Sequence, residues 1–558
     1  MKLSGSEALV YALEQLGVEH IFGLPGDHTH LYDAVYKSKI KHTLVRHEQC
    51  AAHMADGYAR ISGKVGVCDG ANGPGVTNML TGIAEAYTDG IPVVAIASNI
   101  RLGARGRGCF QEVDQLNIFR PVTKEVIDVQ VAARIPEYVR RAFQIAVTGK
   151  PGPVLLNLPL DVIREVHDYS DSELYIDPLW GTWPALRVRP EADLVSKTTT
   201  LLVKSTRPVL WCGGGVMSAN AWEEVSTLAR AHEIPVVTTF MGKGSIAEND
   251  WLCIGTVGQL GKRAANDFIQ EADLIIAIGS RFSNLDTASG KIPGSSTTIV
   301  QINIDPSELG NNAKSDLNIW SDARLFVADL INDLKTKGVG KIGTYKREDI
   351  EKRHQEWLAT YESFPPTDDS ANNKQLHPGT AIHVLNETLK KDDVLVCDSG
   401  FNQIWGGQHF TVGFDGRGYI GPRGFGVMGF ALPAAMGAKI AAPNKRFVAL
   451  CGDGGFAMVI QELETAARHD IPVVVVVLNN RNLEYIKQAQ RQNFQSRFIS
   501  VDFQDTDFAA IAVNFGCDGV RVRTESEFRK ALQRALVSNK PTVIDVVTPE
   551  SAKPDRYI

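Results

Sequence analysis

The sequence contains little that would direct it to a membrane, a nucleic acid or an oxidising compartment. Its 8 cysteines are scattered singly among 558 residues, without a CxxC pair or metal-ligand spacing, which favours buried reduced thiols. The formal net charge of -6 is mild, so no nucleic-acid partner is expected. The longest apolar runs, such as 471–478, are shorter than the roughly 20 residues that span a bilayer. Residues 1–3 lead into a helical pattern without the apolar stretch of a signal peptide, so we expect a cytoplasmic protein with no membrane partner.

A chain of this length is too long for one hydrophobic core, so several domains are expected. Three stretches alternate β-rich apolar runs with helical patterns, which is typical of βαβ units. Two weakly periodic segments, 165–190 and 335–378, are interpreted as linkers, although the second has a helical pattern around 350–361. The sequence thus predicts an α/β fold of three doubly wound parallel-sheet domains, over residues 1–165, 188–335 and 370–548. The expected strands are Val93–Ala97, Val154–Leu158, Val209–Trp211, Val236–Thr239, Leu274–Ile278, Val394–Cys397, Phe447–Leu450 and Val473–Leu478.

In the third domain a glycine-rich turn, Gly452–Gly455, follows a strand and precedes an expected helix over 457–469. Backbone N–H groups in such a turn can approach a phosphate closely, and a helix N-terminus adds a favourable dipole. The next strand ends in Asn480, so Asp453 and Asn480 are predicted at the ligand-binding edge of a parallel sheet. Carboxylate and amide oxygens suit Mg²⁺, although asparagine and aspartate are also common in ordinary turns.

This arrangement resembles the thiamine diphosphate motif, in which Gly-Asp-Gly is followed by an Asn pair, here ending 27 residues after the aspartate. The resemblance implies that Mg²⁺ is held by the side chains of Asp453 and Asn480 and by the carbonyl of Asn482. It also implies that Gly454 and Gly455 bind the diphosphate of the cofactor, thiamine diphosphate. The third domain is therefore expected to be diphosphate-binding.

Two stretches upstream extend the resemblance. Residues 424–429 read Gly-Phe-Gly-Val-Met-Gly, as in the family segment where a bulky residue, here Met428, wedges the cofactor into a bent shape. Backbone groups of Gly426 and Met428 would then bond the aminopyrimidine ring. The loop with Gly400 and Asn402 matches the diphosphate-side loop loosely, because Phe-Asn stands where acetolactate synthases have Gln-His.

In the first domain Glu48 precedes a helical stretch, 50–60, and such a glutamate is ordinarily solvated or a partner of the helix dipole. However, residues 47–60, 72–78, 110–112 and 152–154 resemble the acetolactate synthase and pyruvate oxidase branch of the thiamine diphosphate enzymes. The resemblance implies that Glu48 bonds N1′ of the aminopyrimidine and supports proton removal from C2. In this family the glutamate reaches cofactor held by the partner subunit, so a pyrimidine-binding domain and a homodimer or homotetramer are expected.

The central domain carries glycine-rich segments at 213–215 and 279–282, together with Ile304-Asp305-Pro306. In flavin-bearing members of the family similar segments hold FAD. Members without flavin keep a similar outline, so FAD binding and a scaffold role are both open.

Phe110 and Gln111 resemble the substrate-facing pair of acetolactate synthases. The resemblance implies a carboligase that makes an enamine from a 2-keto acid and adds it to a second carbonyl, such as an aldehyde. Simple decarboxylases protonate the enamine with a His-His pair and a glutamate, where this chain has Phe110-Gln111 and Ile486. Three alternatives remain. The first is such a decarboxylase. The second is an acyl transferase of the sulfoacetaldehyde acetyltransferase kind, because residues 72–75 and 111–116 resemble that enzyme. The third is a non-catalytic relative.

Three departures from the acetolactate synthase pattern gather around the expected substrate. Asp27-His28 stands where relatives have small residues, Glu484 stands in place of a glycine, and Ala489 in place of a tryptophan. These changes make the expected acceptor pocket wider and more polar, which favours a small polar or hydroxylated aldehyde. A turn histidine is more often solvated than catalytic, but His28 adjoins a Pro-Gly that lies beside the thiazolium in relatives, where an imidazole could move a proton.

Overall fold

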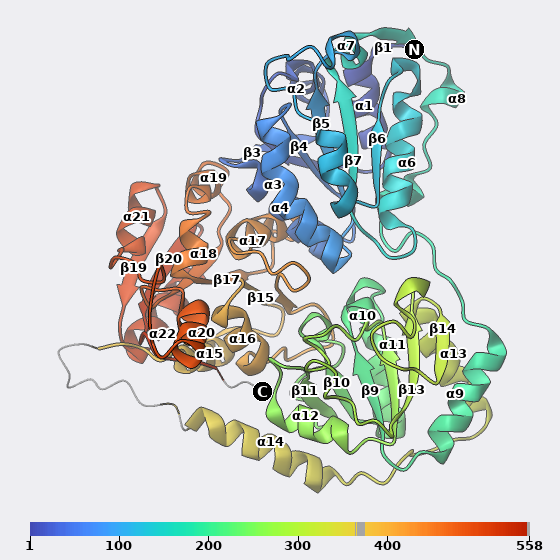
Figure 1. The fold of residues 1–558 in the computed structure, drawn as a ribbon, viewed down its shortest axis with the longest axis vertical. Helices are drawn as coiled ribbons and strands as arrows, with labels where there is room; N and C mark the ends of the chain where they lie inside the picture. Colours follow the sequence, from blue (N-terminus) through green and yellow to red (C-terminus); the bar gives the residue numbers. More distant parts are fainter. Residues whose placement is uncertain (363, 365–373, 555–558) are drawn as a thin grey trace.

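The computed structural model describes residues 1–362, 364 and 374–554. These residues form three six-stranded sheets in which all neighbouring strands run parallel, each within an α/β layer structure (Figure 1). The predicted fold class is therefore confirmed. Within these residues no helix is both long and apolar enough to cross a membrane.

The N-terminal sheet has the strand order β3-β2-β4-β5-β7-β6. Its strands are β2 (His20–Gly23), β3 (Lys41–Leu44), β4 (Gly66–Gly70), β5 (Val93–Asn99), β6 (Glu125–Asp128) and β7 (Val154–Pro159). A short antiparallel pair, β1 (Lys2–Ser4) with β8 (Val166–Asp168), extends this unit beyond residue 165. The helices are α1 (Gly5–Gln15), α2 (Thr29–Tyr36), α3 (Glu48–Ser62), α4 (Pro74–Asp89), α5 (Gln115–Phe119), α6 (Ile135–Val147), α7 (Leu160–Arg164) and α8 (Asp171–Leu174).

The central sheet has the order β11-β10-β9-β12-β13-β14. Apart from the edge strand β14, its strands are almost wholly buried, as expected of a parallel sheet covered on both faces. They are β9 (Pro208–Cys212), β10 (Val236–Thr238), β11 (Cys253–Thr256), β12 (Leu274–Ile278), β13 (Thr298–Asn303) and β14 (Leu317–Trp320). The helices are α9 (Ala192–Lys204), α10 (Gly214–Ser218), α11 (Trp222–His232), α12 (Arg263–Gln270) and α13 (Ala323–Thr336).

The C-terminal sheet has the order β16-β15-β17-β18-β20-β19. Its strands are β15 (Val394–Cys397), β16 (Tyr419–Ile420), β17 (Phe447–Gly452), β18 (Val474–Asn479), β19 (Asp518–Val522) and β20 (Thr542–Val547). The single helix expected over 457–469 is wrong, because the chain forms two short helices with a turn between them. The helices are α15 (Pro378–Thr388), α16 (Phe401–His409), α17 (Ala431–Ala441), α18 (Asp453–Ala457), α19 (Glu462–Arg468), α20 (Glu484–Asn493), α21 (Phe508–Asn514) and α22 (Glu525–Ala535).

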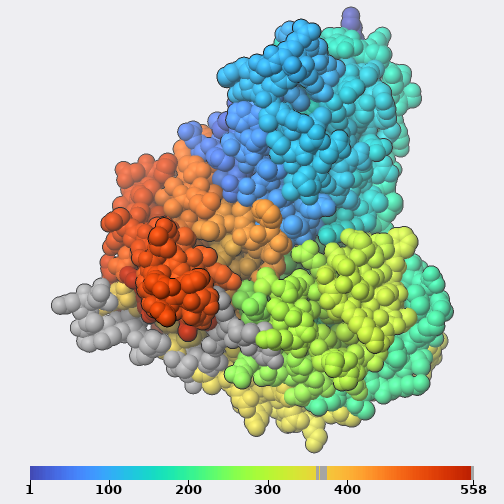
Figure 2. Space-filling model, viewed as in Figure 1, coloured from blue at the N-terminus to red at the C-terminus, as the bar shows by residue number. Residues whose placement is uncertain are grey.

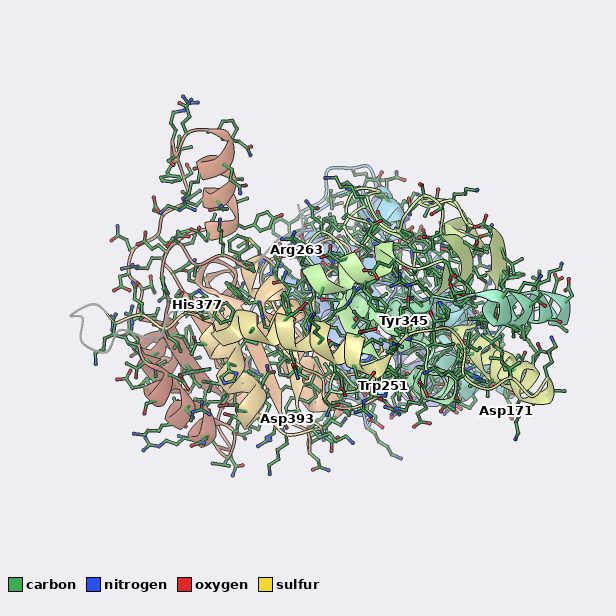
Figure 3. All side chains as sticks on the ribbon, turned by 90° about the horizontal axis from the view of Figure 1, so that it is seen from below. Asp171, Trp251, Arg263, Tyr345, His377 and Asp393 are labelled. Carbon is green, nitrogen blue, oxygen red and sulfur yellow. The ribbon has the colours of Figure 1, made fainter. Side chains whose placement is uncertain are left out.

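The segment interpreted as the second linker contains a helix, α14 (Arg347–Glu362), that bridges the central and C-terminal domains. Figure 3, which views the molecule from below, shows α14 crossing this face between Tyr345 and His377. Arg353 pairs with Glu271 of the central domain at 2.7 Å, and the Trp357 ring stacks on His409 of α16 at 5.2 Å. Residues 363 and 365–373, which include the expected start of the third domain, lie outside the described residues.

The N- and C-terminal domains pack directly on each other (Figure 2). The contact between them runs along α3 and α17. Two glycines permit the close approach of these helices. A Cβ on Gly57 would lie 2.0 Å from the carbonyl oxygen of Ala434, and one on Gly437 would lie 1.9 Å from that of Met54. This contact fixes the position of the helix that begins at Glu48.

Candidate functional site

The predicted metal-binding residues meet where β17 and β18 end, because these neighbouring parallel strands finish at the same edge of the sheet. Asp453 is buried, and its carboxylate oxygens accept hydrogen bonds from the backbone N–H groups of Gly454 at 2.7 Å and Arg481 at 2.6 Å. Burial raises the pKa of Asp453 to about 6, because the charged form is poorly solvated. The side-chain oxygen of Asn480 accepts from the backbone N–H of Asn482 at 3.3 Å.

These oxygens suit a hard divalent cation. The Asn482 side-chain oxygen is buried without a hydrogen-bond partner among the described residues, and the Asp453 carboxylate pairs with no cationic side chain there. A buried oxygen without a hydrogen-bond partner, such as that of the Asn482 side chain, is costly unless a ligand completes it. The donor set of carboxylate, amide and carbonyl oxygens therefore fits Mg²⁺.

The segment 424–429 lies against this turn. The Met428 Cε atom lies 3.5 Å from the position of a Cβ on Gly454. The methionine therefore reaches the turn at residues 453–455, which together with Asn480 and Asn482 is called the cradle below. The backbone N–H of Gly429 donates to Asp398 at 3.0 Å, and Gly426 has a φ of 72°, which favours glycine. These contacts hold the loop in one conformation beside Asp453.

Gly400 and Asn402 approach the cradle from the start of α16. Gly400 caps this helix with a φ of 96°. Asn402 donates to the carbonyl of Ser399 at 3.0 Å, and its amide nitrogen lies 2.9 Å from the position of a Cβ on Gly452. Any larger residue at 452 would collide with Asn402.

Glu48 is the first residue of α3 and is buried rather than solvated. Asn78 of α4 donates to one carboxylate oxygen at 2.9 Å, and the other oxygen lies 3.0 Å from the position of a Cβ on Gly75. The start of α3 and the amide of Asn78 thus hold the Glu48 side chain in place. Asn78 was not singled out as a site residue, although it lies within the stretch 72–78 that carries the family resemblance.

Within one chain Glu48 and the cradle do not meet. Glu48 lies beside Gly75 in the first turn of α4, whereas the backbone of Val427, next to Met428, donates to Glu85 at 3.1 Å. Ten residues of helix separate Gly75 from Glu85, which corresponds to about 15 Å along the axis. One aminopyrimidine ring cannot span that distance.

Several expected substrate residues lie on the Glu48 side. Asp27 accepts from the backbone of Asn72 at 3.3 Å and from Ser98 at 2.6 Å, and His28 beside it is buried. Gln111 has a φ of 62°, and its carbonyl oxygen lies 2.3 Å from the position of a Cβ on Gly73. Phe110 is 86% exposed.

The other two expected substrate residues lie on α20, on the cradle side. Glu484 is buried, which raises its pKa, and it accepts a hydrogen bond from Arg491 at 2.9 Å. Ala489 is half-buried on the same helix. The predicted site residues therefore form two groups, one on each side of the contact between α3 and α17.

Sequence reasoning missed a polar network behind His28, formed by Asp69, Tyr32 and His42. No family motif marks these residues. The available signal was Asp69 itself, a carboxylate at the end of the apolar run 65–68.

A cavity of about 310 Å³ lies where the three domains meet. Its walls come from the glycine-rich ends of β9 and β12, from β13 and from the end of α4. The glycine-rich segments singled out in the sequence therefore line one cavity. The lining includes Asp89, Lys150, Gly213–Gly215, Gly279–Arg281, Asn303, Ile304, Arg417 and Arg423.

Three domain profiles of the thiamine pyrophosphate enzymes match the chain. The N-terminal TPP binding domain matches residues 3–118, the central domain 195–330, and the C-terminal TPP binding domain 398–546. A probable acetolactate synthase large subunit from Methanocaldococcus jannaschii is 38% identical, over 98% of this chain and 92% of the relative. An acetolactate synthase from Arthrospira platensis is 36% identical, over 98% and 94%, and an acetolactate synthase large subunit from Corynebacterium glutamicum is 36% identical, over 99% and 88%. The chain therefore belongs to the thiamine diphosphate (thiamine pyrophosphate) enzyme family, in which its similarity to acetolactate synthases extends over nearly its whole length.

Proposed function

We propose that the protein is a carboligase that transfers the fragment left after decarboxylation of a 2-keto acid to a second carbonyl. The observation that carries the proposal is the buried Glu48 carboxylate, bonded to Asn78 on a chain that resembles acetolactate synthases throughout. The place where decarboxylases have a second glutamate is taken by Ile486, which is 48% exposed. A product that forms a new carbon–carbon bond is therefore favoured over release of the free aldehyde.

The cofactor side of the proposal rests on the cradle. The side chains of Asp453 and Asn480 and the backbone carbonyl of Asn482 would hold Mg²⁺. The diphosphate would meet the backbone of Gly454 and Gly455 and the groups around Gly400 and Asn402, and the aminopyrimidine would meet Gly426 and Met428. When bound, thiamine diphosphate supplies a carbanion at C2, and Glu48 would hold or release the proton at N1′.

We infer a homodimer or homotetramer from the separation of the two groups of residues. Because Glu48 lies about 15 Å along α4 from the loop that carries Met428, each complete site requires the first domain of one chain and the cradle of another. Both groups border exposed apolar side chains, Phe110 on one and Phe425 and Phe503 on the other. Exposed apolar side chains beside an incomplete site are typical of a subunit interface.

The acceptor is proposed to be a small, uncharged, polar aldehyde. Asp27 and His28 line the Glu48 side, and Glu484 lies on the cradle side with Ala489, whose small side chain leaves space. Carboxylates in this pocket disfavour an acceptor that itself bears a carboxylate, such as a second 2-keto acid. They favour hydroxyl groups, which can donate hydrogen bonds to them.

The central cavity is proposed to bind FAD. Glycine-rich strand ends at Gly213–Gly215 and Gly279 let a ligand's phosphates approach the backbone, and Arg281 and Lys150 in the lining offer positive charge. Release of a flavin absorbance spectrum on denaturing the purified protein would support this assignment. A protein purified colourless that also fails to take up added FAD would refute it.

The test of the proposed reaction is a competition. The loaded enzyme is given pyruvate, which is the donor and one possible acceptor, together with glycolaldehyde as the competing acceptor, and products are identified by mass spectrometry. We expect the hydroxyketone formed on glycolaldehyde to predominate. Acetolactate as the main product would refute the acceptor assignment, whereas free aldehyde or an acyl phosphate would refute carboligation itself.

A further inference from the structure

Asp69, at the end of β4, is the centre of a buried polar network in the N-terminal domain. One carboxylate oxygen lies 2.9 Å from Nε2 of His28 and also accepts from the hydroxyl of Tyr32. The other lies 2.9 Å from Nε2 of His42. Three side chains from the β2–α2 loop, α2 and β3 thus converge on one carboxylate.

The absence of a side chain at Gly23 leaves space for the Asp69 carboxylate. A Cβ on Gly23, which pairs with Asp69 across β2 and β4, would lie 1.8 Å from the carboxylate oxygen. Burial alone would raise the pKa of Asp69, but the hydrogen bonds from His28 and His42 outweigh it and hold the pKa well below its usual range. Asp69 is therefore a fixed buried negative charge at neutral pH.

His28 is held by Asp69 through Nε2, which lies 2.9 Å from the carboxylate. Its Nδ1 forms a longer ion pair with Asp27 at 3.5 Å and makes no hydrogen bond among the described residues. Burial would lower the pKa of His28, but the carboxylates of Asp27 and Asp69 outweigh this and raise it to about 9. Both ring nitrogens then carry protons at neutral pH, so Nδ1 is a donor.

Nδ1 of His28 lies on the Glu48 side of the domain. A Cβ on Gly26 would lie 3.9 Å from Nδ1 of His28 and 2.2 Å from the Ala71 side chain. A Cβ on Gly75 would lie 3.0 Å from the Glu48 carboxylate and 3.2 Å from the same Ala71 side chain. His28 and Glu48 are therefore neighbours across Ala71.

We propose that Asp69 is a positioning residue that orients His28 so that its Nδ1–H donates a hydrogen bond to an oxygen of the substrate beside Glu48. His28 then acts as a hydrogen-bond donor rather than as a base. This inference rests on the proposed carboligation, in which the acceptor carbonyl oxygen gains negative charge as the carbon–carbon bond forms. A charged donor aimed at that oxygen stabilises the transition state.

The donor role has a defined pH dependence. The groups that face His28 are Asp27 on its own loop, Tyr32 on α2 and Asp69 on β4, with His42 and Glu48 beyond them. As the pH rises through about 9, His28 loses one proton while Asp69 keeps the other on Nε2. Nδ1 then becomes an acceptor, so carboligation should fall on the alkaline side with a midpoint near 9.

The test uses the full-length holoenzyme with Asp69→Asn, His28→Gln and the double variant. Asp69→Asn should lower kcat/KM for carboligation about 10²-fold and move the alkaline limb to lower pH. Proton exchange at C2 of bound thiamine diphosphate should stay unchanged in it, because that step belongs to Glu48. The double variant should be no worse than His28→Gln alone, since Asp69 acts through His28. Asp33→Asn, which changes an exposed carboxylate of α2 that pairs with Lys37, is the matched control and should be nearly neutral.

Additive losses in the double variant, or an unmoved pH profile in Asp69→Asn, would overturn the proposal. If Asp69→Asn does not fold, titration of His28 in the wild-type protein by NMR decides the matter. A midpoint near 9 supports the proposal, and a midpoint near the ordinary 6.5 refutes it. Failure of the wild-type protein to make any carbon–carbon bond would instead refute the proposed function and leave the titration result intact.

Discussion

Replacing Gly57 by alanine should destabilise the protein through the contact between α3 and α17. The added Cβ would lie 2.0 Å from the carbonyl oxygen of Ala434, closer than the 3.0 Å that real Cβ atoms respect. Because both helices are closely packed, they must separate by about 1 Å to accommodate it. Overpacking of this kind costs about 1–3 kcal/mol.

An opposing effect makes the experiment discriminating. Gly57 lies inside a helix without a positive φ, where alanine is intrinsically favoured over glycine by roughly 0.5–1 kcal/mol. The net expectation is a loss of up to about 2.5 kcal/mol. Each kcal/mol lost lowers the melting midpoint by about 2–4 °C in domains of this size.

The assay is thermal melting of the apoprotein, with Gly340→Ala as the control. No atom lies within 4 Å of the position of a Cβ on Gly340, so that change should be neutral. Gly437→Ala, whose Cβ would lie 1.9 Å from the carbonyl oxygen of Met54, should behave like Gly57→Ala. A higher melting midpoint for Gly57→Ala would show that helix propensity wins and that the two helices are not in close contact.

Three further predictions concern the site. Asp453→Ala should abolish the rise in melting midpoint that thiamine diphosphate with Mg²⁺ causes. Asp502→Ala, which removes an exposed carboxylate, should leave this rise unchanged. An undiminished rise in Asp453→Ala would show that Asp453 does not bind the metal. Glu484→Gln weakens the pair with Arg491. It should lower kcat/KM for hydroxyaldehyde acceptors relative to kcat/KM for pyruvate as acceptor. If the ratio of these two values is unchanged, Glu484 does not take part in acceptor selection. Because folding raises the pKa of His28 from 6.5 to about 9, its stabilisation is full below pH 6.5 and is lost as the pH rises through 9. The melting midpoints of wild type and His28→Gln should therefore converge over that range, and a constant difference would contradict the pKa.

The sheets were predictable because their strands are continuous apolar runs bounded by turns. The expected bounds of Leu274–Ile278 and Val394–Cys397 coincide with β12 and β15. The prediction of one helix over 457–469 was wrong for two reasons. Apolar spacing continues through 458–461, where the backbone turns. The glycines within 453–457 join a short helix despite their low helix propensity.

The sequence predicted which site residues lie close together only where they follow neighbouring strands of one sheet. Asp453 and Asn480 follow neighbouring strands, so their meeting follows from the order of β17 and β18. Asp69 meets His42 only because β2 lies between their strands, an arrangement that spacing along the chain does not specify. The separation of Glu48 from its own cradle likewise depends on how α4 lies between the domains, and no local pattern encodes it.

The central claim is that Glu48 activates thiamine diphosphate. Its most direct test is the rate of hydrogen–deuterium exchange at C2 of the bound cofactor, followed by NMR in wild type and Glu48→Gln. The glutamine keeps the shape of the side chain and can still contact Asn78, so cofactor binding and fold should persist. We expect exchange to fall by orders of magnitude, because an amide cannot support proton transfer at N1′. Unchanged exchange with cofactor bound would contradict the account and assign the activation to another group.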